Sequence, residues 1–284
     1  MEQMQIKIKR YCVGGILLLM GSLLGLMGPQ LVHAAPTTPM TPTLYFHGAP
    51  SSYRSERHMV GAAKKAGVTK SVIRADVAAS GRVTLVGKFR PTSRTPIVEV
   101  NFLNTRNTNY VTNGRWVRNV VRKLQATYHF KQMNMVGHST GNLAIAYYLL
   151  ANSTNRRLPK LAKFVSLGGH YDGVLNEGDW PHRIRLTAAG RPTPMDSAYR
   201  RLLKLRQRYP KKQTAVLNIY GDLGNGTDSD GRVTNNSSKS LRYLLAKRAK
   251  SYRERQFKGA GAQHSRLHHN AQVDRAMIKF LWDK

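Results

Sequence analysis

The chain has 284 residues, of which 41% are hydrophobic, and it is long enough for one large domain or two small ones with an ordinary core. Lysine and arginine total 46 against 14 aspartates and glutamates, which gives a formal net charge of +32. This charge predicts a surface that attracts polyanions, and the attraction should weaken as the salt concentration rises. No arginine-rich run, zinc-finger spacing or RNA-binding aromatic motif indicates a specific nucleic-acid module, so the electrostatic partners to consider are anionic cell-wall polymers or a membrane surface. A diffusely basic, solvated surface is the simpler interpretation.

The first 34 residues have the pattern of a secretory signal peptide. Basic residues precede an apolar segment from 11 to about 27, and Val32-His33-Ala34 offers a cleavage site. The apolar segment is close to membrane-spanning length, so an uncleaved anchor is the alternative. Cys12, the one cysteine, lies in this segment, so a chain cut after Ala34 has no disulfide, thiol nucleophile or cysteine zinc site. We expect a bacterial protein that is secreted or cell-surface associated, or membrane-tethered if uncleaved, with 35–284 as a single domain.

Short apolar runs alternate with longer amphipathic segments in the rest of the chain. This alternation predicts βαβ crossovers and a mainly parallel sheet with helices on both faces, in which ligands bind beyond the carboxyl ends of the strands. The predicted strands cover 43–48, 71–77, 82–89, 96–103, 133–136, 164–167, 215–220 and 252–257. The second pair of these, 82–89 and 96–103, is expected to form a hairpin or an edge insertion. The predicted helices cover 54–66, 113–128, 141–151, 196–208, 237–249 and 270–282.

The strand at 133–136 ends in the sequence GHSTG, which fits the pattern G-x-S-x-G. Gly137 and Gly141 let the backbone turn sharply around Ser139, and the following helix N-terminus favours developing negative charge. A serine that merely caps the helix is the alternative, but it would not need both glycines. The context therefore predicts Ser139 as a nucleophile.

A serine nucleophile needs a general base, and His264 is the favoured candidate. It follows the last predicted strand through a glycine-rich loop, whereas His268, the alternative, lies nearer the final helix. The two histidines are four residues apart, which could bind zinc on one helix face. No glutamate accompanies the first histidine and glycines flank it, so we expect no metal and no cofactor.

The base needs an orienting carboxylate, and three aspartates follow the strand at 215–220. Asp230 is favoured, with Asp228 second and Asp222 third. A calcium loop counted from Asp228 fails because Lys239 stands at its last position. The chain order serine, aspartate, histidine is one of the three known orders of such triads.

Two backbone N–H groups are expected to bind the oxyanion. Thr140, directly after the serine, supplies one, and Ala49, after the first strand, supplies the other, with Gly48 allowing close approach.

The segment 168–194 lies where pocket residues are expected, but it is too short for a large lid. Together with the loop after the first strand it offers Tyr53, His170 and Tyr171 as candidate pocket residues. An open pocket for modest esters is therefore expected.

The stretches FHG, MVGHSTGN, LNIYGDLGNGTDSDGRVTNNSS and AQHSRLHHNAQVDRAMIKFLW resemble the α/β-hydrolase superfamily, and more narrowly the exported cell-surface hydrolases of lactic acid bacteria and their relatives. The resemblance implies an α/β-hydrolase fold with a mainly parallel central sheet and a small cap or insertion. Its S-D-G-x-V pattern places the acid at Asp230, and its Q-H-S-x-L-H pattern places the base at His264. The chain departs from the pattern in the glycine-poor loop APSSYRSER and at Asn142.

The expected function is that of a secreted serine esterase, lipase-like, which cleaves a small or lipid-like carboxylic ester through an acyl-enzyme intermediate. Two alternatives stay open: a basic adhesion protein on a hydrolase scaffold, and an acyltransferase that uses the same triad. The sequence leaves the acyl group and the oligomeric state open.

Overall fold

The computed structural model describes residues 39–284, which belong to one compact unit. The predicted signal peptide, 1–34, and its cleavage site lie outside the described residues. No helix within residues 39–284 is both long enough and apolar enough to cross a membrane.

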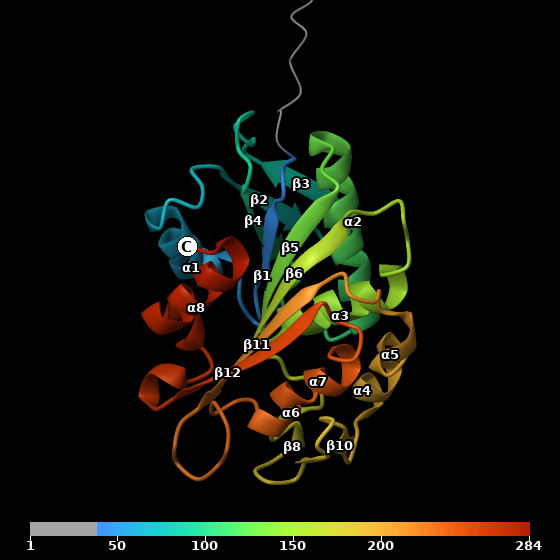
Figure 1. Ribbon diagram of the computed structural model, residues 1–284, viewed down its shortest axis with the longest axis vertical. Helices are drawn as coiled ribbons and strands as arrows, with labels where there is room; N and C mark the ends of the chain where they lie inside the picture. Colours follow the sequence, from blue (N-terminus) through green and yellow to red (C-terminus); the bar gives the residue numbers. More distant parts are fainter. Residues whose placement is uncertain (1–38) are drawn as a thin grey trace, which may run out of the picture. The chain divides into compact units, whose positions relative to one another are not determined.

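An eight-stranded sheet forms the centre of the described unit (Figure 1). Its spatial order is β12-β11-β6-β5-β1-β4-β2-β3, and every neighbouring pair is parallel except β2 and β3. Helices cover both faces, which explains why the central strands are apolar on both sides. The strands are β1 (Thr43–Phe46), β2 (Val72–Val77), β3 (Val83–Val86), β4 (Ile97–Phe102), β5 (Gln132–His138), β6 (Lys160–Leu167), β11 (Ala215–Asp222) and β12 (Ser251–Lys258).

Of the two expectations for the segments 82–89 and 96–103, a hairpin or an edge insertion, the hairpin is wrong. β3 pairs antiparallel with β2 at the sheet edge, whereas β4 inserts between β1 and β2. The burial of the two strands explains the difference: Ile97, Val98 and Val100 in β4 are fully buried, while β3 alternates between half-buried and exposed residues. A strand that is apolar on both faces is stable only inside the sheet.

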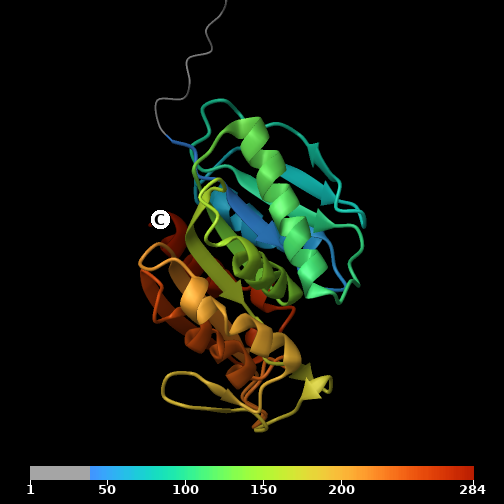
Figure 2. The same ribbon diagram turned by 90° about the vertical axis from the view of Figure 1, so that its right-hand side faces the viewer.

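Two groups of helices cover the two faces of the sheet (Figures 1 and 2). One face carries α2 (Tyr110–Tyr128), α3 (Thr140–Asn152), α4 (Ser197–Leu202), α5 (Leu205–Arg208) and α7 (Leu241–Leu245). The other carries α1 (Arg57–Lys65) and α8 (Ala271–Trp282).

Two predicted helices are each divided in the structure. The segment 196–208 forms α4 and α5, and 237–249 gives α6 (Asn235–Lys239) and α7. The second division falls at Ser240, whose hydroxyl donates to the carbonyl of Ser237 (2.7 Å) and so competes locally with the regular helix pattern.

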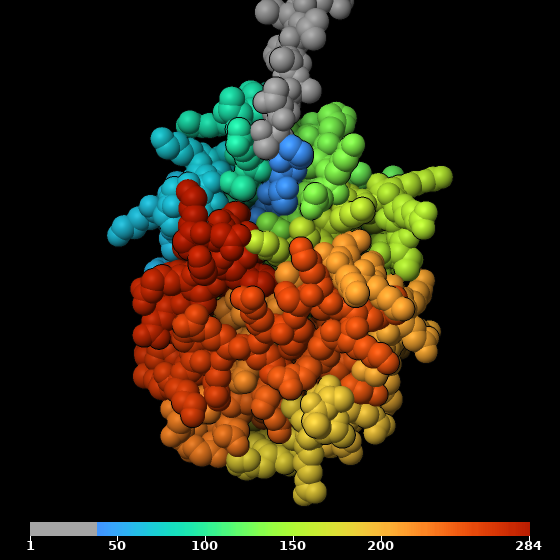
Figure 3. Space-filling model, viewed as in Figure 1, coloured from blue at the N-terminus to red at the C-terminus, as the bar shows by residue number. Residues whose placement is uncertain are grey.

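The carboxyl ends of the parallel strands meet at one end of the sheet. Residues 168–194 cross this end as two small two-stranded sheets, yellow at the bottom of Figure 2. Their strands are β7 (Val174–Leu175), β8 (Gly178–Asp179), β9 (Arg185–Leu186) and β10 (Pro192–Thr193). The C-terminal third of the chain, orange to red in Figure 3, covers much of the face on the β12 side.

Candidate active site

Ser139 lies on a strained turn between β5 and α3. Its φ of 51° and ψ of −124° are rare for a residue with a side chain, and such strain is found mainly at functional sites. Two backbone hydrogen bonds hold the turn. The N–H of Ser139 donates to the carbonyl of Leu167 (3.0 Å), and the N–H of Asn142 donates to the carbonyl of Ser139 (3.0 Å). The Ser139 side chain makes no capping hydrogen bond to α3, so the helix-cap alternative fails.

Three glycines leave room for this turn. A Cβ atom at Gly48 would lie 2.9 Å from the Cβ of Ser139, and one at Gly137 would lie 2.6 Å from Oδ1 of Asn142. At Gly141 a Cβ would overlap the backbone carbonyl oxygen of Phe46 in β1. The predicted elbow glycines are therefore sites where the chain passes close to itself beside the serine.

Gly141→Ala is expected to lower the free energy of unfolding by about 3 kcal/mol, because the β1 carbonyl cannot move out of the way without distorting the central sheet. Urea denaturation measures the change. The matched control is Gly61→Ala in α1, where a Cβ meets no atom within 4 Å. That control should gain about 0.5–1 kcal/mol from helix propensity. Equal stability of the two variants would show that the turn is not tightly packed.

Asp230 and His264 form a buried pair. Oδ2 of Asp230 accepts a hydrogen bond from Nδ1–H of His264 (2.7 Å), and its Oδ1 accepts from the backbone N–H groups of Arg232 (2.9 Å) and Val233 (2.7 Å). The backbone N–H of His264 also donates to the backbone carbonyl of Asp230 (2.9 Å). Because Nδ1 carries the proton, Nε2 of His264 is left as the basic nitrogen.

The pair lies at the same strand ends as Ser139. His138 is paired with Leu167 in the sheet, and its ring centre is 4.9 Å from that of His264. A Cβ at Gly168, the next residue after Leu167, would lie 3.2 Å from the His264 ring and 3.3 Å from Oδ2 of Asp230. The Ser139 hydroxyl is not hydrogen-bonded to another described residue. Catalytic hydrogen bonds of this kind are often long before substrate binds.

The other two aspartates make different contacts. Asp222 is buried and ties its loop together, accepting from Gly224 N–H (2.8 Å) and the side chain of Gln256 (2.9 Å). Asp228 lies on the surface, 3.5 Å from Nδ1 of His182. Of the three candidates, only Asp230 contacts His264.

The expected oxyanion donors lie together. Ala49 and Thr140 line one small pocket, and within residues 39–284 neither of their N–H groups donates a hydrogen bond. His47, which sequence reasoning missed, holds this loop: its Nδ1 donates to the Gly48 carbonyl (2.7 Å), and its Nε2 accepts from Phe102 N–H (3.0 Å). Burial lowers the pKa of His47, which keeps this imidazole neutral and able to make both bonds.

The three candidate pocket residues have different surroundings. Nε2 of His170 is 3.3 Å from the Thr140 hydroxyl, and burial lowers the pKa of His170 to about 3. Tyr53 is half-buried near the surface, and its hydroxyl accepts from Arg57 (3.1 Å). The prediction for Tyr171 is wrong: this side chain is fully buried in the core, where its hydroxyl donates to Ser166 (2.9 Å).

A row of histidines leads from the site to the surface. The His138 ring packs against both His264 and His268 (centres 4.9 and 4.6 Å), and His268 packs against His269 (4.5 Å). His269 in turn lies 5.2 Å from the ring of His58. Nε2 of His138 contacts the backbone carbonyl of His264 (3.1 Å), so His138 supports the segment that carries the predicted base. His268 thus serves as packing for His138 and does not contact Asp230.

This row predicts a loss of stability in acid. Burial, followed by the charges of His269 and His264, lowers the pKa of His268 to about 4. Between about pH 6.5 and 4, His268 is therefore protonated in the unfolded chain but neutral in the folded chain. Because the unfolded chain binds this extra proton, the free energy of unfolding falls as the pH falls through that window. Between pH 7 and pH 4.5, the free energy of unfolding of His268→Asn should fall by about 2–3 kcal/mol less than that of the parent protein. Urea denaturation at both pH values checks this.

The control for that experiment is His129→Asn, at an exposed position with a φ of 55° that asparagine tolerates. It should lose as much stability on acidification as the parent protein. An identical loss in the His268 variant would contradict the pH dependence assigned to the row.

No three His, Cys, Asp or Glu side chains of the described part of the chain lie together as metal ligands. The candidate site combines a serine on a strained turn, a histidine–aspartate pair and two backbone N–H groups, at the carboxyl ends of β1, β5, β11 and β12. This fold and this arrangement define an α/β hydrolase.

The chain belongs to the DUF915 family, described as α/β hydrolases of unknown function, whose model matches residues 33–284. It is similar in structure to the product of the gene lin2722 of Listeria innocua, with a TM-score of 0.77 and 22% identity over 86% of this chain and 95% of that one. It is also similar to a protein of Lactobacillus plantarum WCFS1 provisionally named a cell surface hydrolase, with a TM-score of 0.71 and 22% identity over 87% and 93% of the two chains. None of the curated proteins compared with the chain matches it. The expected fold and the resemblance are confirmed.

Proposed function

We propose that the protein is a serine esterase that hydrolyses small carboxylic esters through an acyl-enzyme intermediate. The observation that carries the proposal is the strained turn at Ser139 beside the His264–Asp230 pair. A serine hydroxyl gains nothing structurally from such a turn, because its side chain makes no capping bond there. Strain of this kind is retained where it presents a reactive group.

The proposed reaction has two steps. Nε2 of His264 takes the hydroxyl proton of Ser139 as its oxygen attacks the ester carbonyl, and the protonated imidazole then gives that proton to the leaving alcohol. Water attacks the resulting acyl-serine by the same route and releases the acid. Asp230 holds the imidazole in the required tautomer, and the N–H groups of Ala49 and Thr140 stabilise the oxyanion.

The pocket next to these donors supports a short acyl group. It is small, and apart from Phe102 and the methyl group of Ala49 it is lined by glycines and polar side chains, including Asn104, Thr105 and Asn107. The segment 168–194 contributes only short two-stranded pieces across this end, which supports a site without a large lid.

A panel of aryl esters of graded acyl length tests this specificity. We expect kcat/KM to fall at least about tenfold between the butyrate and octanoate esters, since additional methylenes find little space in the small pocket. The same panel run with Ser139→Ala corrects for hydrolysis that does not depend on the serine. A higher kcat/KM for long-chain esters or triglycerides would contradict the small acyl pocket.

We further propose that this activity is located outside the cell, either released or held at the surface. The basic start, apolar segment and small-residue cleavage site within residues 1–34 support export. N-terminal sequencing of the protein from its native host distinguishes a chain cut after Ala34 from an uncleaved, membrane-tethered chain.

A further inference from the structure

The positive charge is unevenly distributed along the chain. The seventy-two residues 100–171 contain ten lysines or arginines and no aspartate or glutamate. In addition, six of the fourteen carboxylates are buried, namely Glu56, Asp172, Asp179, Asp222, Asp230 and Asp274. These six carboxylates are therefore not available at the surface to pair with exposed cations.

Three adjoining hollows concentrate these cations around the C-terminal end of α3. Their volumes are about 600, 260 and 570 Å³, and Asn152 lines all three. Ten different arginine or lysine side chains line them, and no aspartate or glutamate does. We call this continuous surface the basic groove.

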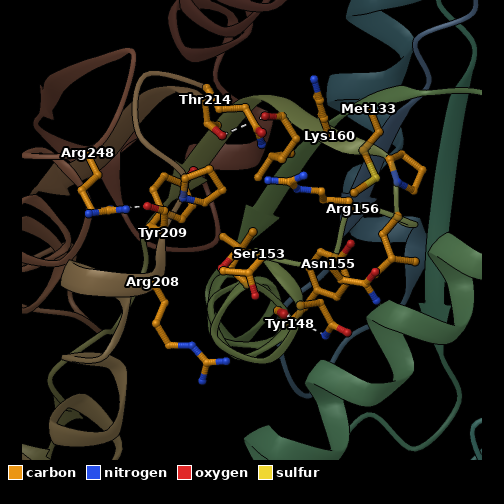
Figure 4. Close-up of a pocket in the computed structure, with 18 residues that line it drawn as sticks. Met133, Tyr148, Ser153, Asn155, Arg156, Lys160, Arg208, Tyr209, Thr214 and Arg248 are labelled. Atoms are coloured by element: carbon orange, nitrogen blue, oxygen red, sulfur yellow. Dashed lines mark hydrogen bonds between the residues drawn. The ribbon is translucent and has the colours of Figure 1, made fainter.

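The largest hollow lies at the start of β6 (Figure 4). Arg156, from the connection between α3 and β6, and Lys160, the first residue of β6, line it on one side, while Arg208 and Arg248 come from the opposite side. The side chains of Arg156 and Lys160, and of Arg122 in the adjoining hollow, are exposed and have no ion pair or hydrogen bond among the described residues.

Clustered cations without counter-charges repel one another, and the protein retains them at a cost in folding free energy. The C-terminus of α3 offers only about half a negative charge at Asn152, which cannot neutralise ten cations. The groove thus attracts multivalent anions at a place where the protein provides no neutralising group of its own.

We infer that the basic groove binds a phosphodiester polymer that carries no aromatic bases. A single-stranded nucleic acid would need aromatic side chains on which its bases could stack. The tyrosines that line the hollows, Tyr147, Tyr148 and Tyr209, are all buried. An anionic membrane would need apolar side chains to insert, and Val111 is the one strongly exposed large apolar residue of the groove. Charged hollows in series fit a flexible chain with one phosphate per repeat.

The groove lies away from the candidate active site. Its residues Met133, Lys160 and Leu161 stand at the amino ends of β5 and β6, whereas Ser139 follows the carboxyl end of β5. A polymer held there leaves the strand ends that carry Ser139 uncovered. The groove can retain the protein on an anionic matrix while the site remains open to substrate.

Binding of the purified protein to a poly(glycerol phosphate) chain, measured by fluorescence anisotropy from 50 to 300 mM salt, tests this inference. The triple variant Arg122→Gln/Arg156→Gln/Lys160→Gln should lose at least about tenfold in affinity at 50 mM salt. Its slope of log affinity against log salt should be smaller by about 2, since three phosphate contacts are removed. The matched control, Lys64→Gln/Lys65→Gln/Lys70→Gln, removes the same charge from exposed positions on and after α1 and should change both values little.

Further arms use oligo-dT and phosphatidylglycerol vesicles at the same phosphate concentration. We expect weaker binding to both, and no difference in ester hydrolysis between the groove variant and the parent. Equal losses in the groove and control variants would show that affinity comes from net charge alone and would overturn the groove. Tighter, groove-dependent binding of oligo-dT or vesicles would overturn the assignment of the occupant.

Discussion

Ser139→Ala is expected to reduce kcat for a short-chain aryl ester by on the order of 10⁴-fold. Alanine retains the Cβ atom and therefore the strained backbone, but it has no oxygen with which to form the acyl-enzyme. Because the Ser139 hydroxyl makes no hydrogen bond to another described residue, its removal should leave the thermal midpoint within a few degrees of the parent value. Steady-state kinetics and thermal unfolding of the same preparation give both quantities.

Ser265→Ala is the matched control, since it removes an exposed hydroxyl from the residue next to the predicted base. It should keep nearly the full rate. If the Ser139 variant also kept the full rate, the proposed nucleophile would be wrong, and the adhesion alternative would gain weight.

Asp230→Asn is expected to cost a similar factor, about 10⁴-fold in kcat, while the fold is retained. The N–H groups of Arg232 and Val233 both donate to Oδ1. They would fix the asparagine so that its oxygen faces them and its NH₂ group faces Nδ1 of His264. That ring nitrogen would then have to accept, which moves the imidazole proton to Nε2, where the base is needed. The loss follows from the wrong tautomer.

Asp228→Asn controls for the change of charge in the same loop. Asp228 is exposed, has a φ of 47° that asparagine tolerates, and lies beside His182. Its variant should keep the parent rate. A large loss there combined with a normal rate for Asp230→Asn would transfer the acid role to Asp228.

Local patterns in the sequence predict much of the fold and of the site. A strand, a G-x-S-x-G turn and a helix are adjacent in the chain, so the position of Ser139 can be predicted from neighbouring residues alone. His264 and the group of three aspartates that includes Asp230 could be proposed because each follows a strand, and parallel strands end at the same edge of the sheet. Among the three aspartates, Asp230 was favoured by the resemblance to the S-D-G-x-V pattern, and the side-chain contacts, which depend on the conformation of the loop, agree with it.

Features that depend on strand order or on distant packing were not predictable in the same way. The insertion of β4 between β1 and β2 depends on which neighbours can bury both of its faces, and spacing along the chain does not determine this. Tyr171 follows a strand end as pocket residues do, yet its ring turns into the core. The role of His47 could have been suspected from a histidine that directly follows the apolar strand β1 and precedes Gly48.

The basic groove could not be predicted from the sequence either, because its charges come together only in the folded chain. Its cations come from α2, from α4, α5 and the turn between them, from the connection before β6 and the first residue of β6, and from the chain after α7, so no sequence run reveals them. The absence of carboxylates between residues 99 and 172 was countable in the sequence. That count alone does not place the charges together, because it says nothing of how the helices pack.

The most direct test of the central claim, that Ser139 is a reactive nucleophile, is covalent labelling with a fluorophosphonate followed by peptide mapping. We expect one adduct per chain, on the peptide that contains Ser139, and much slower labelling of Asp230→Asn, because the base would no longer activate the hydroxyl. No adduct, or an adduct confined to another serine, would contradict the account.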